Sequence, residues 1–227
     1  MAENTAASKH DAQRSPIAEH VYERLIDMFI SGEIAAGQRL SVDGLSRELQ
    51  VSQTPIRRAL TLLEADGLAH NSYLAGYTAA EKLTEEELDE LFEVRLLIEP
   101  KAAALAAQRG TAEQFDEIEA LSERMVVRDV GGNPMDYSAF ARLDAQFHEA
   151  IVAAASNAML LRNYVTIRAH VHLFRLRFHR TVTADAITEH AEILEALRSR
   201  DAGRAETAAR EHLLQSHARL KRAFETP

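Results

Sequence analysis

The stretch "LSRELQVSQTPIRRAL", from Leu45 to Leu60, predicts two short helices joined by a tight turn near Gln50-Val51-Ser52. Ser52 is a good N-cap for the second helix. Pro55 lies in the first turn of that helix, where its missing N–H costs little. Two helices at this spacing are typical of a helix-turn-helix, the motif that reads the major groove of DNA.

The segments on either side complete a winged helix-turn-helix. An apolar helical stripe from Ile17 to Phe29 precedes the pair. After it, "LAHNSYLAGYTA" is a short Tyr- and Thr-rich segment with a Gly inside, which predicts a small hairpin. We therefore expect a disordered tail over residues 1–14, a DNA-binding domain over residues 15–80, and a linker from Thr78 to Leu83.

The second helix of the pair would enter the major groove by its N-terminal end, where it presents Gln53, Thr54, Arg57 and Arg58. Arg can bind O6 and N7 of guanine, Gln can pair with adenine, and the hydroxyls of Ser and Thr can hold phosphate. The alternative is that Arg57 and Arg58 only solvate an exposed helix face.

Composition limits the function classes. The net charge is −9, and the first 80 residues hold seven Lys and Arg against ten Asp and Glu, which argues against indiscriminate nucleic-acid binding. A DNA contact must therefore be a small local patch. The chain has no cysteine, so any bound metal must have nitrogen and oxygen ligands. No apolar run approaches the ~18 residues of a membrane span, and the N-terminus lacks a secretory segment. We expect a cytoplasmic protein without a membrane partner.

Residues 84–225 predict a second domain, an antiparallel all-helical bundle of about six helices, so the chain as a whole is mostly α. Two helix starts carry capping boxes, in which a Thr side chain and a Glu or Gln three residues later satisfy each other's backbone N–H groups. The boxes are Thr84 with Glu87 and Thr111 with Gln114.

A candidate metal site lies in this second domain. Asp144 and His148 lie four residues apart in the apolar run "LDAQFHEAIV", so they share one helix face within reach of one ion. His190 has apolar residues at its helical neighbour positions, and His212 lies beside Ala208 and Ala209, so both are expected to point inward. Three imidazoles and one carboxylate suit Zn²⁺, Ni²⁺ or another borderline divalent ion. The alternative for each histidine is an ordinary core residue.

Arg95 falls on the same helical stripe as Leu88, Leu91 and Phe92, so it is expected to point into the bundle. A buried guanidinium requires an anionic partner. The partner could be Glu99, one turn later, or a dimer contact. It could also be a bound organic carboxylate whose oxygens reach both Arg95 and the metal.

The stretch "GEIAAGQRL…LSRELQVSQTPIRRALTLLEADGLAH…AGYTA" closely resembles the DNA-binding domain of GntR-type bacterial transcription regulators. The resemblance places Thr54, Pro55 and Arg57 in the recognition helix and makes Gly76 the wing glycine. The full set of residues that we expect to face DNA is Arg47, Ser52, Gln53, Thr54, Pro55, Arg57, Arg58 and Gly76.

Two positions depart from that family's pattern. The family commonly has Arg where this chain has Gln53, and it often has a basic or an acidic-basic pair near Asp43. These departures bear on the operator sequence that the protein reads and leave the expected docking mode unchanged.

Three further stretches resemble the FCD ligand-binding domain of the FadR-like branch of the same family. They are "LFEVRLLIEPKAAALAA", "DAQFHEAIVAAASNAMLL" and "EHAEILEALRSRDAGRAETAAREHL". The resemblance spans nearly all of residues 84–222, and six helices would suggest the VanR-like subgroup. It implies that the metal ligands are Asp144, His148, His190 and His212. In such domains small carboxylates are the usual effectors, and the candidate effector-binding residues are Arg95, Arg168 and His170.

Together these features predict a homodimeric, ligand-responsive transcription regulator, not an enzyme, which we expect to be a repressor that reads an inverted-repeat operator. A divalent metal, Zn²⁺ or Ni²⁺, would anchor each helical domain, and a small organic acid would complete its coordination. One alternative is a metal sensor in which the ion itself is the effector. The other is a helical metal-dependent hydrolase, although no general base is obvious.

Overall fold

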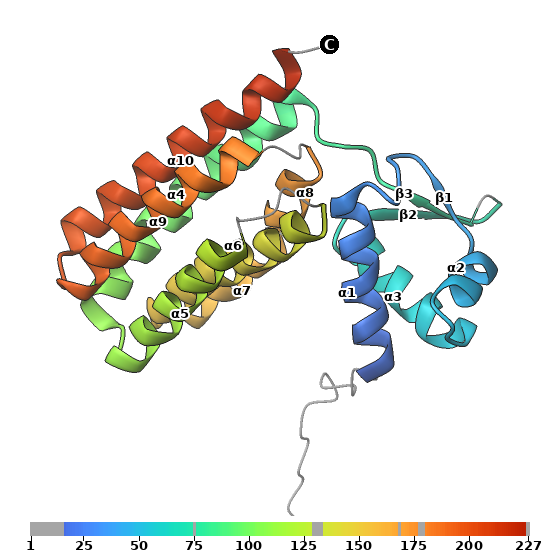
Figure 1. Ribbon diagram of the computed structural model, residues 1–227, viewed down its shortest axis with the longest axis horizontal. Coiled ribbons are helices and arrows are strands. Elements are labelled where there is room, and N and C mark those ends of the chain that lie inside the picture. Colours follow the sequence, from blue (N-terminus) through green and yellow to red (C-terminus); the bar gives the residue numbers. More distant parts are fainter. Residues whose placement is uncertain (1–15, 75, 129–133, 168, 177–179, 226–227) are drawn as a thin grey trace, which may run out of the picture.

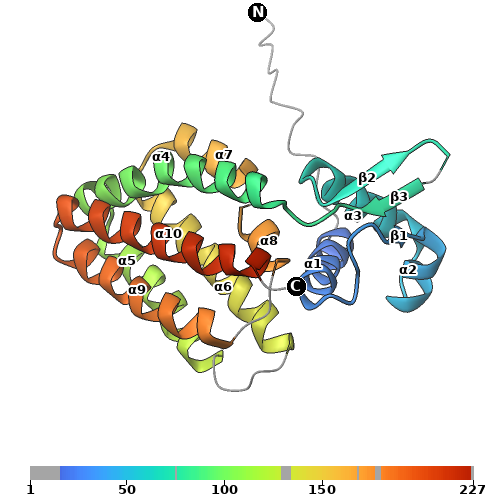
Figure 2. The same ribbon diagram turned by 90° about the horizontal axis from the view of Figure 1, so that it is seen from above.

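The computed structural model describes residues 16–74, 76–128, 134–167, 169–176 and 180–225. They form a small domain of three helices and a three-stranded sheet, followed by a larger all-helical domain (Figure 1, Figure 2). The mostly α fold class predicted from the sequence is confirmed. In chain order the elements are α1 (Pro16–Ser31), β1 (Arg39–Leu40), α2 (Val42–Glu48), α3 (Gln53–Ala65), β2 (Ala69–Ser72), β3 (Gly76–Ala79), α4 (Glu85–Arg109), α5 (Ala112–Arg128), α6 (Pro134–Ala154), α7 (Ala158–Ile167), α8 (Ala169–Phe174), α9 (Arg180–Arg198) and α10 (Ala202–Glu225).

The core of the N-terminal domain lies between α1 and α3. Each helix has one apolar stripe, and the two stripes pack against each other because only that arrangement removes both from water. Leu45 of α2 and Leu68, just after α3, close the core. The fully enclosed side chains from the two long stripes are Leu25, Ile56, Leu60 and Leu63.

The turn between α2 and α3 has the predicted position. The hydroxyl of Ser41 caps α2 by accepting a hydrogen bond from Gly44 N at 3.2 Å. Gln50 adopts a left-handed backbone with a φ of 56°, and its Nε2 donates to the carbonyl of Arg47 at 2.6 Å. Ser52 takes the N-cap position of α3, as predicted, but its hydroxyl makes no capping hydrogen bond.

The predicted hairpin is the wing, formed by β2 and β3 in antiparallel register from Ala69 opposite Ala79 to Ser72 opposite Gly76. The sequence did not predict β1, a two-residue strand that pairs with the other edge of β3 and makes the sheet order β1-β3-β2. Since β3 extends to Ala79, the connection to the helical domain begins after that residue and not at Thr78.

Both predicted capping boxes are confirmed. Thr84 Oγ1 accepts from Glu87 N at 3.2 Å, and Glu87 Oε2 accepts from Thr84 N at 2.8 Å. The corresponding distances for Thr111 and Gln114 are 3.3 and 2.9 Å. These caps fix where α4 and α5 begin.

In the helical domain α10 lies alongside α4 and α9, while α5 packs against α6 and α9 (Figure 1, Figure 2). Its largest core cluster includes Phe115, Ile118 and Phe147. Where the sequence predicted about six helices after residue 84, the described residues form seven, α4 to α10. No helix within the described ranges is long and apolar enough to cross a membrane.

The two domains are joined by side-chain contacts as well as by the linker. Arg175, just after α8, is buried and donates to the carbonyls of Ala80 at 2.5 Å and Glu81 at 3.4 Å. Its guanidinium also lies 5.0 Å from the centre of the Phe29 ring on α1. One side chain of the helical domain therefore holds both the linker and the first helix.

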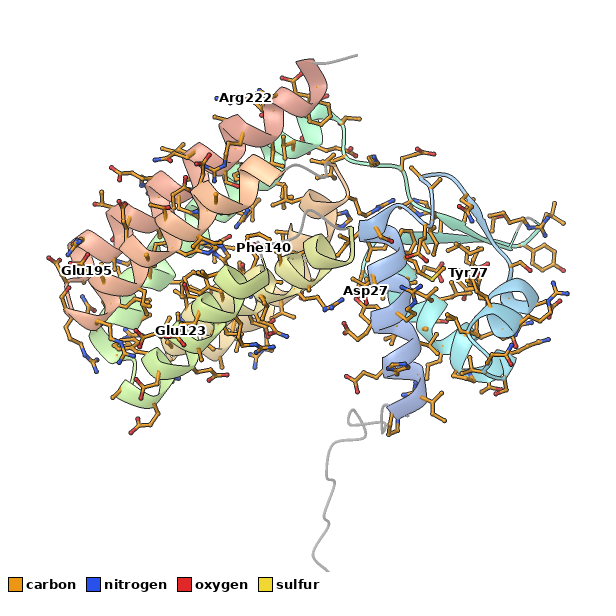
Figure 3. The ribbon with its side chains drawn as sticks, in the orientation of Figure 1. Asp27, Tyr77, Glu123, Phe140, Glu195 and Arg222 are labelled. Carbon is orange, nitrogen blue, oxygen red and sulfur yellow. The ribbon has the colours of Figure 1, made fainter. Side chains whose placement is uncertain are left out.

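Helix α6 makes a second set of contacts with the DNA-binding domain. Arg142 forms a salt bridge with Asp27 of α1, and the adjacent Ala141 packs into the N-terminal core. Figure 3 shows Asp27 on the side of α1 that faces the helical domain. The same helix also carries Asp144 and His148, so the domain junction and the candidate metal site share one element.

Candidate functional site

Three of the four predicted metal ligands converge from three helices. His148 comes from α6, His190 from α9 and His212 from α10, and each offers a ring nitrogen within 4.8 Å of the others. All three are buried, and their ring centres lie 4.7 to 5.2 Å apart. Phe147 stacks on His190 at 4.3 Å and closes that side of the group.

Asp144, the fourth predicted ligand, lies at the edge of this histidine group. It is buried, and its Oδ1 is 3.5 Å from His190 Nε2. The spacing of four residues between Asp144 and His148 places both side chains on the inward face of α6, as predicted. The structure thus brings all four residues to one place in the bundle.

Two buried carboxylates hold the outer nitrogens of the histidines. Glu99 Oε2 lies 2.8 Å from His148 Nδ1, and Glu189 Oε2 lies 2.8 Å from His212 Nδ1. A carboxylate accepts a hydrogen bond, so each Nδ1 carries a proton, and Nε2 is the nitrogen through which each ring could bind a metal. Burial lowers the pKa of His212, against the opposing effect of Glu189, and so favours the neutral, metal-binding form.

The sequence predictions missed Glu189. It lies next to His190 but about 100° around the helix, and its partners, His212 and Arg219, are both on α10. Burial alone would raise the pKa of Glu189, but hydrogen bonds from His212 and Arg219 lower it. The carboxylate therefore stays charged between a candidate ligand and a cation.

Arg95 lies inside the bundle, as predicted, and pairs with Glu99. Its Nε donates to Glu99 Oε1 at 2.5 Å, and its Nη2 donates to Oε2 at 3.3 Å. Burial tends to lower the pKa of Arg95 and to raise that of Glu99, yet the ion pair reverses both shifts. Since Glu99 also binds His148, the three side chains form one chain of contacts from Arg95 to the histidine group.

The space beside the histidines is small. A cavity of about 10 Å³ is lined by Glu99, His148 and His212 together with apolar side chains. That is roughly the space of one water molecule, so an organic acid does not fit without movement of the lining. Of the other effector candidates, Arg168 and the side chain of His170 lie outside the described residues.

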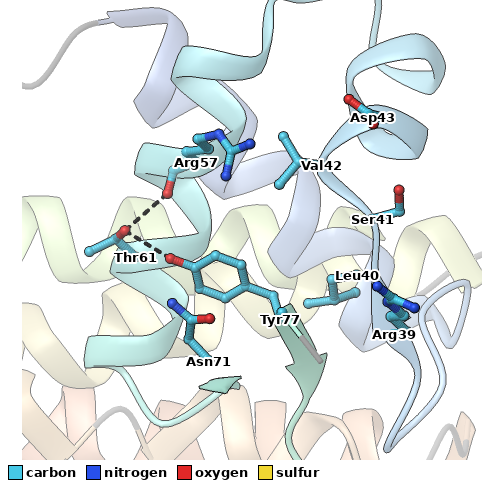
Figure 4. A pocket seen from close by; sticks show the side chains of 10 residues that line it. Arg39, Leu40, Ser41, Val42, Asp43, Arg57, Thr61, Asn71 and Tyr77 are labelled. Carbon is cyan, nitrogen blue, oxygen red and sulfur yellow. Dashed lines mark hydrogen bonds between the residues drawn. The ribbon is translucent and has the colours of Figure 1, made fainter. Parts of the chain in front are cut away.

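Some of the predicted DNA-facing residues line a groove of the N-terminal domain. This groove of about 810 Å³ runs between α3, the wing and the start of α2, and its polar lining includes Arg39, Asp43 and Arg57 (Figure 4). Arg57 extends from α3 toward the α2 side of the groove. Thr61 Oγ1 lies 3.2 Å from the hydroxyl of Tyr77, which connects α3 to the wing.

Arg57 and Gly76 are the members of the predicted set that line this groove. Gly76 begins β3 with a φ of +74° and lines the groove. Pro55 is partly buried in the first turn of α3. Exposed side chains at the N-terminus of α3 and the end of α2 are Arg47, Ser52, Gln53, Thr54 and Arg58. Arg39 and Tyr77 were not predicted, because β1 and the wing bring them to the groove from outside the two-helix motif.

Comparison with known proteins identifies both parts of the chain. Residues 17–72 match the family of bacterial regulatory proteins called the gntR family, and residues 90–215 match the FCD domain. The chain is 29% identical over 201 residues to the "Probable D-xylose utilization operon transcriptional repressor" of Paenarthrobacter nicotinovorans, with 88% of this chain and 87% of that protein covered. It is 28% identical over 225 residues to the Glc operon transcriptional activator of Escherichia coli (strain K12), with coverage of 88% and 87%.

A solved structure has the same fold. E. coli McbR/YncC matches with a TM-score of 0.76 and 21% sequence identity, and the match covers 93% of this chain and 100% of that one. The arrangement of a winged helix-turn-helix followed by a helical domain is therefore common to the two proteins.

Proposed function

The chain belongs to the gntR family of bacterial transcriptional regulators and carries an FCD domain, and on this premise we propose a homodimeric regulator controlled by a small organic acid at a metal-containing site. The observation that carries the proposal is the group of three buried histidines from three helices, held by carboxylates on their outer nitrogens. An FCD domain that binds a ligand next to these helices could alter how the DNA-binding domain meets its operator.

The donor set fits a divalent metal ion. The donors are the imidazole nitrogens of His148, His190 and His212 and the carboxylate of Asp144, which are ligands that Zn²⁺ and Ni²⁺ accept when thiolates are absent. Such an ion would supply a fixed positive charge and a place for an oxygen ligand. The role of the surrounding protein would be to keep the imidazoles neutral and correctly turned.

The proposed effector is a small carboxylate that reaches Arg95. The guanidinium is deeply buried and already neutralised by Glu99, so an incoming acid would have to share Arg95 with that residue or replace it. Because the cavity beside His148 is only about 10 Å³, binding must accompany an opening of the bundle. Because the acid would bind only to the opened bundle, its binding would favour the open form of the domain.

The small cavity also favours a second candidate function, in which the metal ion is itself the effector. A cavity of about 10 Å³ holds an ion or a water molecule, so such a sensor would need no opening. Operator affinity would then follow the concentration of free metal and would not respond to organic acids.

We propose that the regulator binds an inverted repeat as a homodimer, because a two-fold protein reads a two-fold operator. Apolar side chains on the outer faces of α4 and α7 support a second copy as the partner: Leu97 is 79% exposed and Met159 is 60% exposed. The two helices contact each other. We propose repression, the function named for the relative from Paenarthrobacter nicotinovorans, although the E. coli relative is named an activator.

Metal content tests the histidine site. We expect elemental analysis of the purified, tag-free protein to find about one divalent ion per chain, and His148→Ala and His190→Ala each to lose it. His70→Ala is the matched control, since His70 is exposed on the wing. If the wild-type protein stays metal-free after incubation with Zn²⁺ and with Ni²⁺, the histidines are core residues and the metal proposal fails.

DNA binding and its control are tested with the metal-loaded protein. Thr54→Ala and Arg57→Ala should weaken binding to a selected operator while circular dichroism shows an unchanged fold. Titration of that operator with and without a panel of small carboxylic acids then separates the two effector hypotheses. An affinity that changes with an acid supports the first, and an affinity that follows free metal alone supports the second.

A further inference from the structure

Asp43 and Gln53 form a hydrogen bond across the helix-turn-helix. Gln53 Nε2 donates to Asp43 Oδ1 at 2.6 Å, so the first residue of α3 is tied to the first turn of α2. Both side chains are exposed, and Asp43 also lines the groove between α3 and the wing (Figure 4). Both residues lie outside the apolar core of the domain.

The chemistry of the pair fixes the orientation of the amide. A carboxylate offers only acceptors, so the NH₂ group of Gln53 must face Asp43, and Oε1 must lie on the opposite side of the planar amide. If Asp43 were absent, the amide could turn over at little cost, since its oxygen and nitrogen have nearly the same shape. The pair therefore turns a side chain with two usable orientations into one with a single orientation.

We propose that Asp43 makes Gln53 an adenine-reading residue of this regulator. With one N–H directed to Asp43, the amide presents Oε1 and its second N–H to the major groove. Adenine offers the matching N6 donor and N7 acceptor, whereas guanine offers two acceptors, O6 and N7, one of which would face Oε1. This inference rests on the proposed reading of DNA by the N-terminus of α3.

Two more features support a role in base reading. Gln53 is at the N-terminal end of α3, the part of a recognition helix that reaches base edges. Arg57 lies one turn after Gln53 on α3 and lines the groove together with Asp43. Arginine has only hydrogen-bond donors, which suit the two acceptors of guanine, so a candidate guanine-reading residue lies close to Gln53. The two residues would then read different bases in one half-site.

The test is a selection of duplex DNA from a random pool by the full-length protein and its variants. We expect the wild type to enrich an inverted repeat with adenine at one position per half-site, by about tenfold over guanine. Gln53→Arg should change that position to guanine and so identify it. Asp43→Ala should keep adenine there but admit guanine almost equally, because the N–H released from Asp43 lets the NH₂ group of Gln53 donate to both O6 and N7 of guanine.

The matched control is Glu48→Ala, which removes one exposed negative charge from the end of α2 instead of its start. It should raise the affinity for all sequences, as any lost acidic charge near DNA would, without changing the preference at the Gln53 position.

The outcomes distinguish the two proposals. If the wild type enriches no sequence, the proposed DNA reading itself fails. If it enriches an inverted repeat but prefers guanine at the Gln53 position, or if Asp43→Ala stays as selective for adenine as the wild type, the protein reads DNA and the inference about Asp43 is wrong.

Discussion

Glu99 is one carboxylate with two partners inside the helical bundle. It neutralises Arg95 and also fixes the ring of His148, although it is almost fully buried. A side chain with the same shape as Glu99 but without its negative charge would therefore not replace it. A neutral side chain of the same size would leave a guanidinium in a region with little water.

Glu99→Gln should accordingly destabilise the protein by about 3–5 kcal/mol, the usual cost of leaving one member of a buried ion pair without its partner. Urea unfolding of the metal-free protein measures this. The double variant Arg95→Met/Glu99→Met, which removes both charges and keeps the volume, should recover much of the loss. A Glu99→Gln variant as stable as the wild type would contradict the prediction.

The pH dependence of folding has one contribution from the surface pair of α4 and α10. Asp89 Oδ2 lies 2.9 Å from Lys221 Nζ, and Asp89 Oδ1 lies 2.6 Å from His217 Nε2. Hydrogen bonds from Lys221, first, and from His217 lower the pKa of Asp89. Since the folded-state pKa is below the unfolded one, this contribution is present above the unfolded pKa and is lost as pH falls through the folded pKa.

Carbon-detected NMR titration of Asp89 should therefore give a pKa below the ordinary value for Asp, and Lys221→Met should raise it toward that value. Lys101→Met, on an exposed part of α4, is the control that should leave the Asp89 pKa unchanged. An equal pKa in the wild type and in Lys221→Met would show that the pair does not form in solution.

For single residues, the local sequence patterns predicted correctly which side chains point into the helical bundle. The spacing of Asp144 and His148 and the apolar neighbours of His190 predicted inward-facing side chains, and the structure places them together. That these residues bind metal stays a prediction. Glu189 was not predicted, because its partners are on another helix, and the pairing of α9 with α10 has no signature in either helix alone.

At the scale of elements, two glycines at helix ends have opposite environments. A Cβ on Gly110, the C-cap of α4, would lie 2.6 Å from Phe115 Cε1 and 2.8 Å from the carbonyl oxygen of Ala106. A Cβ on Gly203, in the first turn of α10, would make only an ordinary van der Waals contact, with Asp201 Oδ1 at 3.6 Å. Packing therefore requires a glycine at position 110 but not at position 203.

Gly110→Ala should therefore lower the free energy of unfolding by about 1–3 kcal/mol, the cost of forcing atoms into a packed site. Gly203→Ala should raise it by up to about 1 kcal/mol, because alanine loses less backbone entropy in a helix. Thermal or urea unfolding of the two variants side by side tests the contrast. Equal effects of the same sign would contradict it.

The elements themselves were predictable to different degrees. Capping boxes at Thr84 and Thr111 marked two helix starts correctly, because a cap is encoded within a few residues. The strand β1 was missed, since its two residues, Arg39 and Leu40, form a strand only by pairing with Thr78 and Tyr77 much later in the chain. Ser52 has the predicted N-cap position, but its hydroxyl makes no capping hydrogen bond.

At the scale of the whole molecule, the two domains are held by a few side chains as well as by the covalent linker. Arg175 reaches across the junction to two carbonyls and to the Phe29 ring. Burial lowers the pKa of Arg175, and the nearby Glu81 partly offsets this effect. Hydrogen bonds from a charged donor contribute about 1.5–3 kcal/mol, so this residue is a substantial part of the junction.

Arg175→Met should separate the unfolding of the two domains. We expect calorimetry to resolve two transitions in the variant where the wild type shows one, because the DNA-binding domain loses its support from the helical domain. Arg210→Met, on the exposed face of α10, should leave a single transition. A single transition in both variants would mean that the junction is held by other contacts.

The position of helix α6 determines where the chain can accept inserted residues during evolution. Arg142 of α6 forms a salt bridge with α1, and Asp144 and His148 follow within the next two turns of the same helix. A movement of α6 is therefore transmitted directly to the DNA-binding domain and does not require the linker. Within the linker Lys82 is exposed, whereas Leu83 packs against an apolar cluster of the helical domain and Thr84 caps α4. Insertions at Lys82 should accumulate more freely than any that change the register of α6, where one added residue would rotate the ligands by about 100° away from the junction.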